Sequence, residues 1–299
     1  MLENHALQHD ARNADDSRRP DDTLMAAIDP TARIAAGAQI GRDVVIGPYC
    51  VIGPNVTLGE GCRLVAHVHL TGHTTLGPRT VVQPFASLGT APQSASYRGG
   101  PTRLEIGADC DIREHVTMNT GTEDGGGITR VGERCLFMVG SHVGHDCIVG
   151  ARVTLANNAL LGGHVVVGDY TFLGGGSGVH QFTRIGEGVM ISGVGGVAAD
   201  VIPFGLVVGH RGVLGGLNVV GLKRRGFSRA DMHRLRTAYR ELFFGEQTLS
   251  RRRQDFEARY AGDPLIGKIA AFLRASGTRP LMRPARTGGG SADDADETA

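Results

Sequence analysis

An aliphatic residue recurs at every sixth position over most of this 299-residue chain. The first series runs without a miss from Ile28 to Leu88, and it returns in the same phase from Ile106 to Met118. After one reset it runs again from Val131 to Val197. A period of six fits neither the 3.6-residue repeat of a helix nor the alternation of a strand. It predicts a solenoid of triangular cross-section, in which each side is a short strand whose aliphatic residue points to the axis.

Glycine supports this interpretation. The chain contains 46 glycines, and small residues often follow the axial position, as in Ile40-Gly41 and Val131-Gly132. We expect glycine at corners because it tolerates positive φ. Three sixes make one coil, so each strand pairs with the strands one coil above and below it. The sequence therefore predicts an all-β solenoid, a parallel β-helix. Parallel crossovers are normally right-handed, and the periodicity alone does not fix the hand.

The repeat also divides the chain into parts. The predicted β-helix covers residues 25–203 and is interrupted by two polar, glycine-rich stretches, 89–105 and 119–130. The first interruption preserves the phase of the series and the second shifts it. A solenoid tolerates insertions as loops on one face, which is often the binding face. We therefore expect both loops to mark the working side of the molecule.

The ends of the chain do not follow the repeat. Residues 204–283 are predicted to form a small α-helical C-terminal domain, with helices that begin near Ser228, Thr248 and Pro264. Residues 1–24 and 284–299 are polar and poor in core residues, which predicts disorder. Because the repeats begin just after Met25, this residue is a candidate start of translation, with the preceding residues a misannotated or disordered extension.

Composition excludes several classes of function. The net charge of +1 gives no reason to expect a nucleic-acid partner. The five cysteines contain no CxxC pair, so they predict buried small hydrophobes rather than a zinc ribbon or a redox motif. No stretch approaches the roughly 18 apolar residues of a membrane span, and the N-terminus lacks the apolar region of a signal peptide. We expect a cytoplasmic protein.

The segment GSHVGHDC, residues 140–147, is the best candidate for chemistry. Val143 belongs to the axial series, so His142 and His145 flank an inward position and are expected to point outward. Taken alone, they are equally well explained as solvent-exposed histidines without a role. A neutral imidazole can act as a general base near pH 7. Asp146 can orient such a base or stabilise its imidazolium.

Stacking strengthens this candidate. One coil takes about eighteen residues, so Gly163 and His164 are expected beside His145, and His180 lies one coil further on. Three histidines therefore approach one edge of the prism. The backbone N–H of Gly163 is in a position to serve an oxyanion. This combination is typical of a general-base site.

Two other groups are weaker candidates. His67, His69 and His73 lie close together, as three ligands of a zinc ion would. Trimeric γ-class carbonic anhydrases, which are also β-helices, use an H-x4-H pair and a third histidine further upstream, and none of the spacings here matches. The basic run Lys223-Arg224-Arg225 is either a solvated face or a contact for phosphates.

The motifs HVGHDC, LANNALLGGH, GVHQF and GLKRRGFSR, in this order and spacing, resemble the acyl-ACP–UDP-N-acetylglucosamine O-acyltransferase family, which begins lipid A synthesis. The similarity runs from about residue 26 to at least residue 245 and includes both insertions. The resemblance implies a left-handed β-helix, a known exception to the right-handed rule. It also implies a homotrimer with active sites in clefts between neighbouring subunits.

The resemblance implies transfer of a 3-hydroxyacyl chain from acyl carrier protein to the 3-OH of UDP-N-acetylglucosamine, with no metal or cofactor. In that family the position of His145 is the general base, that of Asp146 supports it, and that of Gly163 supplies the oxyanion donor. A glycine at position 193, in the floor of the acyl groove, predicts a long acyl chain. The implied substrate-binding residues are Gln93, Asn119, His142, His164, His180, Gln181, Gly193, Asn218, Arg224 and Arg225.

The chain departs from the family pattern at three places. Asn119 and Arg211 stand where histidines are common, and Ser96 stands where a lysine precedes Tyr97. These departures leave a UDP-sugar with a 3-amino group, and thus an amide product, as an alternative acceptor. Three further alternatives are the N-acyltransferase that acts two steps later, a zinc enzyme of the γ-carbonic anhydrase type and an inactive carrier-binding solenoid. The N-acyltransferase usually has an extra N-terminal uridine-binding domain, whereas only about 25 residues precede the repeats here.

Overall fold

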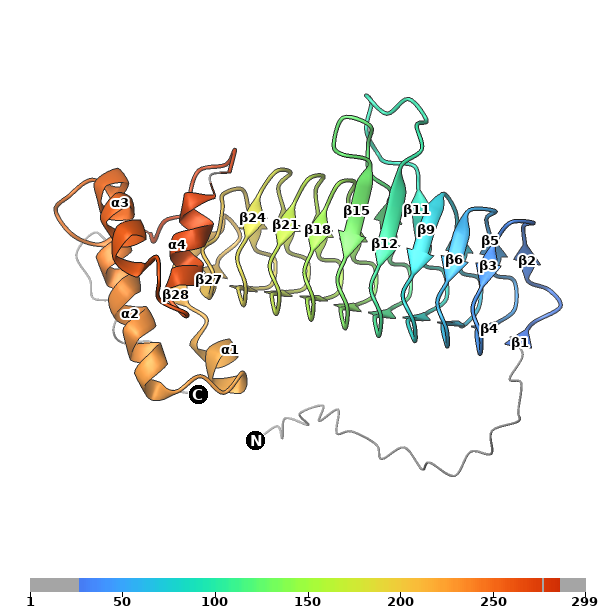
Figure 1. The fold of residues 1–299 in the computed structure, drawn as a ribbon, viewed down its shortest axis with the longest axis horizontal. Helices are drawn as coiled ribbons and strands as arrows, with labels where there is room; N and C mark the ends of the chain where they lie inside the picture. Colours follow the sequence, from blue (N-terminus) through green and yellow to red (C-terminus); the bar gives the residue numbers. More distant parts are fainter. Residues whose placement is uncertain (1–26, 276, 286–299) are drawn as a thin grey trace.

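The computed structural model describes residues 27–275 and 277–285. The predicted N-terminal extension lies outside these residues, as do residues 286–299 of the predicted tail. The described chain forms a left-handed parallel β-helix with helices packed at its C-terminal end (Figure 1). Both predicted insertions project together from one side of the β-helix (Figure 1). The predicted fold class is therefore confirmed.

Three sheets form the sides of the prism. Sheet A contains β1 (Ala27–Ile28), β4 (Val45–Ile46), β7 (Arg63–Leu64), β10 (Val81–Val82), β13 (Asp111–Ile112), β16 (Leu136–Phe137), β19 (Thr154–Leu155), β22 (Phe172–Leu173), β25 (Met190–Ile191), β27 (Gly205–Val208) and β28 (Val213–Leu217). Sheet B contains β2 (Arg33–Ile34), β5 (Val51–Ile52), β8 (His69–Leu70), β11 (Ser87–Thr90), β14 (Thr117–Asn119), β17 (His142–Val143), β20 (Leu160–Leu161), β23 (Gly178–Val179) and β26 (Gly196–Val197). Sheet C contains β3 (Gln39–Ile40), β6 (Val56–Leu58), β9 (His73–Leu76), β12 (Arg103–Ile106), β15 (Ile128–Val131), β18 (Ile148–Val149), β21 (Val166–Val167) and β24 (Arg184–Ile185).

The strand register explains what the two insertions do to the repeat. In a regular coil Ile46 pairs with Leu64, eighteen residues away. Across the first insertion Val82 pairs with Ile112, which is thirty residues away. The added twelve residues are two whole repeats, so the phase survives. Across the second insertion Ile112 pairs with Phe137, a separation of twenty-five, and the seven extra residues reset the phase.

The axial residues fill the core as the periodicity predicts. From Ile46 to Val197 every one of them is at most 4 % exposed. Ile28 is 45 % exposed because β1 pairs with β4 on one side only. All five cysteines are buried and free. The column of aliphatic side chains is a dry core that makes every coil depend on its neighbours.

The glycines after the axial positions serve a different purpose from the one predicted. Gly41, Gly47 and Gly132 do not have positive φ. A Cβ at Gly47 would lie 1.8 Å from the carbonyl oxygen of Val65 on the next coil, so these glycines allow close backbone approach. The left-handed corner positions are shared between sixteen non-glycine residues, several of them with aromatic rings, and glycines such as Gly61, Gly140 and Gly188, where the predicted role of glycine is confirmed.

One corner carries four of those rings. Tyr49, His67, Phe85 and His115 all have φ between 52° and 66° and stack with ring centroids 5.0 to 5.1 Å apart. All four side chains belong to exposed residues. Stacking between successive coils offsets the cost of the left-handed backbone, about 1–2 kcal/mol for an L-residue. We call these four residues the ring ladder.

The C-terminal region starts with the antiparallel hairpin of β27 and β28, which closes sheet A. Four helices follow, namely α1 (Val219–Arg224), α2 (Arg229–Phe243), α3 (Leu249–Tyr260) and α4 (Gly267–Arg274). Ser228 caps α2 in a capping box with Asp231, and Thr248 caps α3, as the sequence predicts. The short α1 is not predicted, because it lies in a glycine-rich stretch.

Polar contacts join the helices to the last coils. Glu187 on the β-helix pairs with Arg225 and with Lys268 of α4. Burial opposes ionisation of Glu187, but the hydrogen bonds from both cations outweigh it and lower the pKa of this carboxyl.

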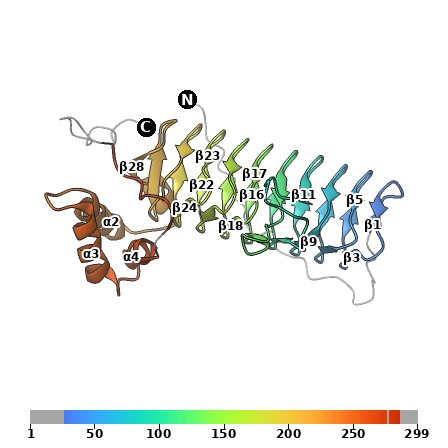
Figure 2. The same cartoon turned by 90° about the horizontal axis from the view of Figure 1, so that it is seen from above.

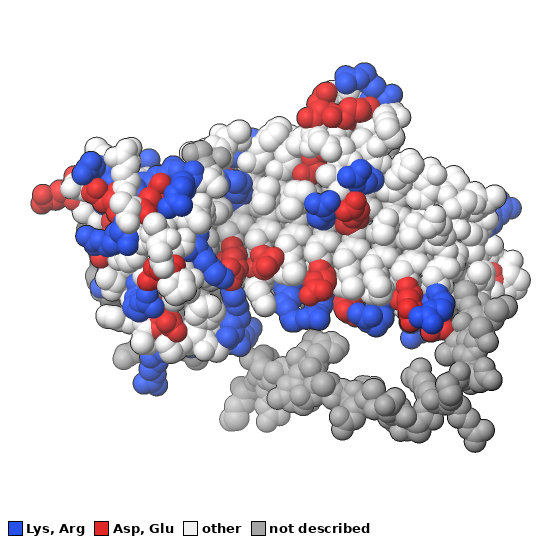
Figure 3. All heavy atoms as spheres, viewed as in Figure 1, with Lys and Arg blue, Asp and Glu red and all other residues white. Residues whose placement is uncertain are grey.

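Seen from above, the helices gather at one end of the prism (Figure 2). In Figure 3 the charged side chains crowd over this end, whereas the flat side of the β-helix is largely uncharged. Among the described residues, no helix combines the length and apolarity needed to cross a membrane.

Candidate active site

An open cavity of about 760 Å³ lies on the outer face of sheet B. Its floor comes from the outward positions of β17, β20, β23 and β26, whose side chains shrink along the stack from His142 to Leu160 and then to Gly178 and Gly196. This decrease in size hollows the face. Seven of the predicted site residues line the cavity, namely Gln93, Asn119, His142, His145, Gly163, His180 and Gln181.

His145 and Asp146 form a hydrogen-bonded pair at one edge of the cavity. The Nδ1 atom of His145 lies 2.8 Å from Oδ2 of Asp146. The side chain of Asp146 is 1 % exposed, whereas that of His145 is 14 % exposed. An ionised carboxylate only accepts, so Nδ1 carries the proton and donates it to Asp146. The Nε2 atom of His145 is then an unprotonated acceptor, which is what a general base requires.

His164 lies next to this pair, as the eighteen-residue coil predicts. Its ring centroid is 5.0 Å from that of His145, and its other face stacks on Phe182 at 4.3 Å. Its Nε2 atom is 3.6 Å from Oδ2 of Asp146. Burial lowers the pKa of His164, and the attraction of Asp146 only partly opposes this. His164 is therefore a second, weaker partner for the same carboxylate oxygen.

His142 is held by its neighbour in sheet B. Its Nδ1 atom lies 2.8 Å from the hydroxyl of Thr117 on β14. Burial is the main cause that lowers the pKa of His142. A lowered pKa keeps this ring neutral near pH 7, so it is suited to hydrogen bonding rather than to ion pairing.

Gly163 faces His145 across the step between two coils. A Cβ at this position would lie 2.5 Å from Cε1 and 2.6 Å from Nε2 of His145, so only glycine leaves room for the imidazole. The backbone N–H groups of Gly162 and His164 donate to carbonyls of neighbouring coils. Within the described part of the chain, the N–H of Gly163 has no backbone acceptor. This N–H is available for a ligand in the cavity.

One coil beyond Gly163, His180 is held by a residue that the sequence did not reveal. Arg279 comes from the segment after α4, and its Nη2 atom lies 2.6 Å from Nδ1 of His180. Its Nε donates to the carbonyl of Gln181 at 3.0 Å. The Nδ1 atom is also 3.2 Å from that carbonyl. Because guanidinium can only donate and its contact is shorter, Nδ1 accepts from Arg279.

The segment that carries Arg279 is itself tied to the β-helix. Asp200 forms a parallel bridge with Leu281, and its carboxylate accepts from Arg184. No motif marks residues 277–285, so only the long-range pairing could have identified Arg279.

Asn119 joins the cavity to the first insertion. Its Nδ2 donates to the hydroxyl of Thr90 at 2.9 Å and to the carbonyl of Ala91 at 3.0 Å. The side chain is buried, and its Oδ1 has no hydrogen-bond partner in the described chain. This oxygen is buried behind the cavity wall, without a partner among the described residues. Arg211, the second departure from the family pattern, lines the same cavity.

Four predicted site residues lie elsewhere on this chain. Asn218 caps α1 and donates to the carbonyl of Gly188. Arg225 pairs with Glu187 and lies over the ring of Tyr170 at 4.2 Å. Arg224 is exposed at the end of α1. These three residues lie at the corner between sheets C and A, away from the cavity.

Gly193 is the fourth of these residues. It lies at the corner between sheets A and B, where an added Cβ would meet only the carbonyl oxygen of Gly175, at 3.5 Å. Space for a larger side chain is therefore present at this position.

The predicted zinc alternative has no support in the geometry. Among the described residues, the three histidine, cysteine or acidic side chains close enough to share a metal ion are His145, Asp146 and His164. The group of His67, His69 and His73 does not meet this requirement, and His67 is stacked in the ring ladder. Both oxygens of Asp146 already accept hydrogen bonds, so the first group is organised as a hydrogen-bonded network.

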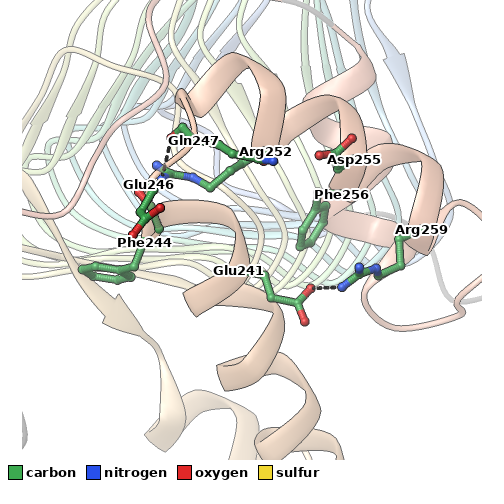
Figure 4. A pocket seen from close by; sticks show the side chains of 9 residues that line it. Glu241, Phe244, Glu246, Gln247, Arg252, Asp255, Phe256 and Arg259 are labelled. Carbon is green, nitrogen blue, oxygen red and sulfur yellow. Dashed lines mark hydrogen bonds and ion pairs between the residues drawn. The ribbon is translucent and has the colours of Figure 1, made fainter.

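A second, smaller hollow lies between α2 and α3 and is shown in Figure 4. The guanidinium groups of Arg252 and Arg259, which line it, already form hydrogen bonds or ion pairs within the protein. Arg252 donates to the backbone carbonyls of residues 242, 243, 245 and 247 and so caps α2. Arg259 pairs with Glu241 (Figure 4). The hydrogen bonds in this hollow hold α2 and α3 together. The cavity on sheet B is therefore the better candidate for an active site.

Comparison with known proteins finds relatives of both the β-helix and the C-terminal region. The model of the bacterial transferase hexapeptide family matches residues 37–72 and 128–163. The model for domain 2 of UDP N-acetylglucosamine O-acyltransferase matches residues 200–282. Among solved structures, a UDP-N-acetylglucosamine acyltransferase from Campylobacter jejuni is 34 % identical, with a TM-score of 0.81 over 86 % of this chain and 100 % of that one.

Curated relatives are closer in sequence. The acyl-(acyl-carrier-protein)–UDP-N-acetylglucosamine O-acyltransferase of Azorhizobium caulinodans is 58 % identical over 212 residues, which are 71 % of this chain and 78 % of the relative. The enzyme of the same name from Paracoccus denitrificans is 52 % identical over 204 residues, which are 68 % and 77 % of the two chains. The chain therefore belongs to the acyl-(acyl-carrier-protein)–UDP-N-acetylglucosamine O-acyltransferase family.

Proposed function

We propose that this protein transfers a 3-hydroxyacyl chain from acyl carrier protein to the 3-OH of UDP-N-acetylglucosamine, in the first step of lipid A synthesis. The observation that carries the proposal is the His145–Asp146 pair, which faces the open N–H of Gly163 at the edge of an elongated cavity. The relatives named above carry this activity in their names. We place the reaction in the cytoplasm, where free thiols such as the five buried cysteines persist.

The mechanism follows from the proton positions. Nε2 of His145 takes the proton of the 3-OH as the oxygen attacks the thioester carbonyl. The charge that develops on the carbonyl oxygen is stabilised by the N–H of Gly163. Asp146 stabilises the imidazolium through Nδ1. When the tetrahedral intermediate collapses, the C–S bond breaks, and the imidazolium returns its proton to the leaving thiolate.

The cavity suits an acyl chain. Beyond the histidines its wall is formed by Leu160, Leu161, Val179, Val197 and the glycines of β23 and β26. An extended hydrocarbon lying on this strip would bury apolar surface on both sides. Gly193 does not line this cavity, but it lies at the corner between sheets A and B, where an added Cβ would meet only a backbone oxygen. This open corner of the same sheet supports a long chain.

The positions of the site residues support a homotrimer. His145 and the cavity belong to sheet B and its corner with sheet C, whereas Asn218 and Arg225 lie at the corner between sheets C and A. One chain does not bring these two groups to a single cavity. In a ring of three copies, the second group of one subunit can complete the cavity of the next. We propose that Asn218, Arg224 and Arg225 contact the nucleotide in that way.

The proposal is tested by acyl transfer to UDP-N-acetylglucosamine with His145→Ala, followed by mass spectrometry of the product. Loss of a general base lowers the rate by more than about 10²-fold. His115→Ala, in the exposed ring ladder, is the matched control and retains the wild-type rate. Near-normal transfer by His145→Ala would refute the mechanism.

The acceptor is tested in the same assay with the 3-amino analogue of the sugar nucleotide. We expect the ester product from the hydroxyl substrate to form faster than the amide. A faster amide product would reassign the acceptor to the 3-amino sugar nucleotide.

A further inference from the structure

The second insertion, residues 119–130, covers the buried side of the catalytic pair. Thr122 in this loop makes two hydrogen bonds to Asp146. Its backbone N–H donates to Oδ1 at 2.9 Å, and its hydroxyl donates to Oδ2 at 2.7 Å. These two bonds and the bond from His145 leave the carboxylate in one fixed orientation.

The hydroxyl of Thr122 is itself oriented. It accepts a hydrogen bond from the N–H of Gly125 at 3.0 Å. Its own proton is therefore directed to Asp146, which as a carboxylate can only accept. The loop also packs tightly on this group, since a Cβ at Gly125 would lie 2.2 Å from Cγ of Asp146. The backbone of Asp146 is held as well, because its N–H donates to the hydroxyl of Thr129.

Fixing the carboxylate matters because a competing partner is present. Oδ2 of Asp146 lies 2.8 Å from Nδ1 of His145 and 3.6 Å from Nε2 of His164. A modest rotation of the carboxylate would exchange the first histidine for the second. His145 would then lose the acceptor that holds its proton on Nδ1, and Nε2 would no longer be reliably free to act as a base.

We propose that Thr122 is a positioning residue, which holds Asp146 on His145 and away from His164 and thereby fixes the tautomer of the base. The inference rests on the proposed role of His145. It extends the site to the second insertion. Glu123 in this insertion contacts the first insertion, because its carboxylate accepts hydrogen bonds from the backbone N–H groups of Arg98 and Gly100. Thr122 does not line the cavity, so it acts through Asp146 and not on the substrate.

Three variants test this role in the full-length protein. Thr122→Val keeps the size of the side chain and removes the hydroxyl, so kcat falls about 10- to 100-fold while KM changes less than about threefold. Thr122→Ser restores the donor and most of kcat. Thr102→Val is the matched control, because within residues 27–275 and 277–285 the buried hydroxyl of Thr102 bonds only Thr120, in the same pair of loops. The kcat of this control stays within about threefold of wild type. An unchanged kcat in Thr122→Val, a change in KM alone, or equal losses in Val and Ser would overturn the proposal.

A double-mutant cycle separates positioning from a general loss of structure. If Thr122 acts through Asp146, Thr122→Val costs nothing further in an Asp146→Ala background. An equal loss in both backgrounds would show that the threonine only supports the loop.

Nitrogen-15 NMR of the His145 ring gives a readout that does not depend on the substrate. The wild-type ring carries its proton on Nδ1, and Thr122→Val shifts the ring toward a mixture of tautomers. An unchanged tautomer in that variant contradicts the positioning role even if the enzyme acts on another acceptor. Inactivity of the wild-type protein on UDP-N-acetylglucosamine, with the tautomer shift present, contradicts only the proposed function.

Discussion

Two corners of the β-helix are built on the same repeat and differ in what covers them. The ring ladder stacks four rings along the corner between sheets A and B, each on a left-handed backbone position and each exposed. The corner between sheets B and C places Asp146, His164 and Phe182 at equivalent left-handed positions, with φ from 59° to 64°. Both corners include histidines, namely His67 and His115 in the ring ladder and His145 and His164 in the second corner. Only the second is covered by an insertion.

The difference shows what distinguishes the proposed active site from a structural ladder. In the second corner a carboxylate takes the place of one ring, and the loop around Thr122 removes it from water. A hydrogen bond to a buried carboxylate is stronger than one in water. The preceding residue, His145, then faces a cavity and the open N–H of Gly163. The ring ladder has neither a buried carboxylate nor a covering loop.

The largest effect on the difference between the two corners is expected from Gly163→Ala. The added methyl group would lie 2.5 Å from the imidazole of His145, which must rotate out of place and away from Asp146. We expect a fall in kcat of more than about 10²-fold, comparable to loss of the base. The measurement is the steady-state rate of acyl transfer, together with circular dichroism to show that the β-helix is retained.

Gly175→Ala is the control for this variant, because it also lies at a β-helix corner. Its added Cβ would meet only the carbonyl oxygen of Asn157, at 3.4 Å, which is ordinary contact. The rate of this variant stays within about twofold of wild type. If Gly163→Ala were as active as Gly175→Ala, the proximity of Gly163 to the imidazole would have no catalytic consequence.

A smaller effect is expected from Arg279→Ala, which disturbs the same corner between sheets B and C but does not contact His145 or Asp146. The variant removes the donor that holds Nδ1 of His180 and the bond to the carbonyl of Gln181. We expect kcat/KM to fall about 5- to 20-fold, mainly through KM, because His180 lines the cavity without touching the base. Arg283→Ala, from the same segment, serves as the control. A fall in kcat as deep as that of Gly163→Ala would place Arg279 in the chemistry itself.

The sequence predicts the regular part of this molecule well because the repeat is local. An axial residue at every sixth position fixes the strands, and the eighteen-residue coil correctly places His164 beside His145. The lengths of the insertions even predict which of them shifts the register. The reason given for the glycines holds at corners such as Gly61 and Gly188. It was wrong for the glycines that follow axial residues, because close contact between coils depends on backbone distances that a sequence does not show.

The rest of the site depends on contacts between segments that no period relates. Thr122 reaches Asp146 across the second insertion, and Arg279 reaches His180 over 99 residues. The free oxygen of Asn119 follows from bonds to Thr90 and Ala91 in the other insertion. Loops of this length have no pattern that fixes their path, so Thr122 and Arg279 could not have been identified from the sequence. Asn119 was named through the family resemblance, but its hydrogen bonds could not have been predicted.

The smallest predicted effect is a pH dependence of stability that comes from the covered corner. Burial lowers the pKa of His164. In the unfolded chain a histidine titrates near pH ~6.5, so below that pH the unfolded state binds a proton that the folded ring resists. The contribution of His164 is thus fully present above about pH 7 and is lost as the pH falls toward the lowered value. We expect the melting temperature of wild type to fall from pH 7.5 to pH 5.5, and His164→Gln to reduce that fall by a few degrees at most. If the melting temperature fell equally with pH in both proteins, burial of the His164 ring would not disfavour its protonated form in the folded state.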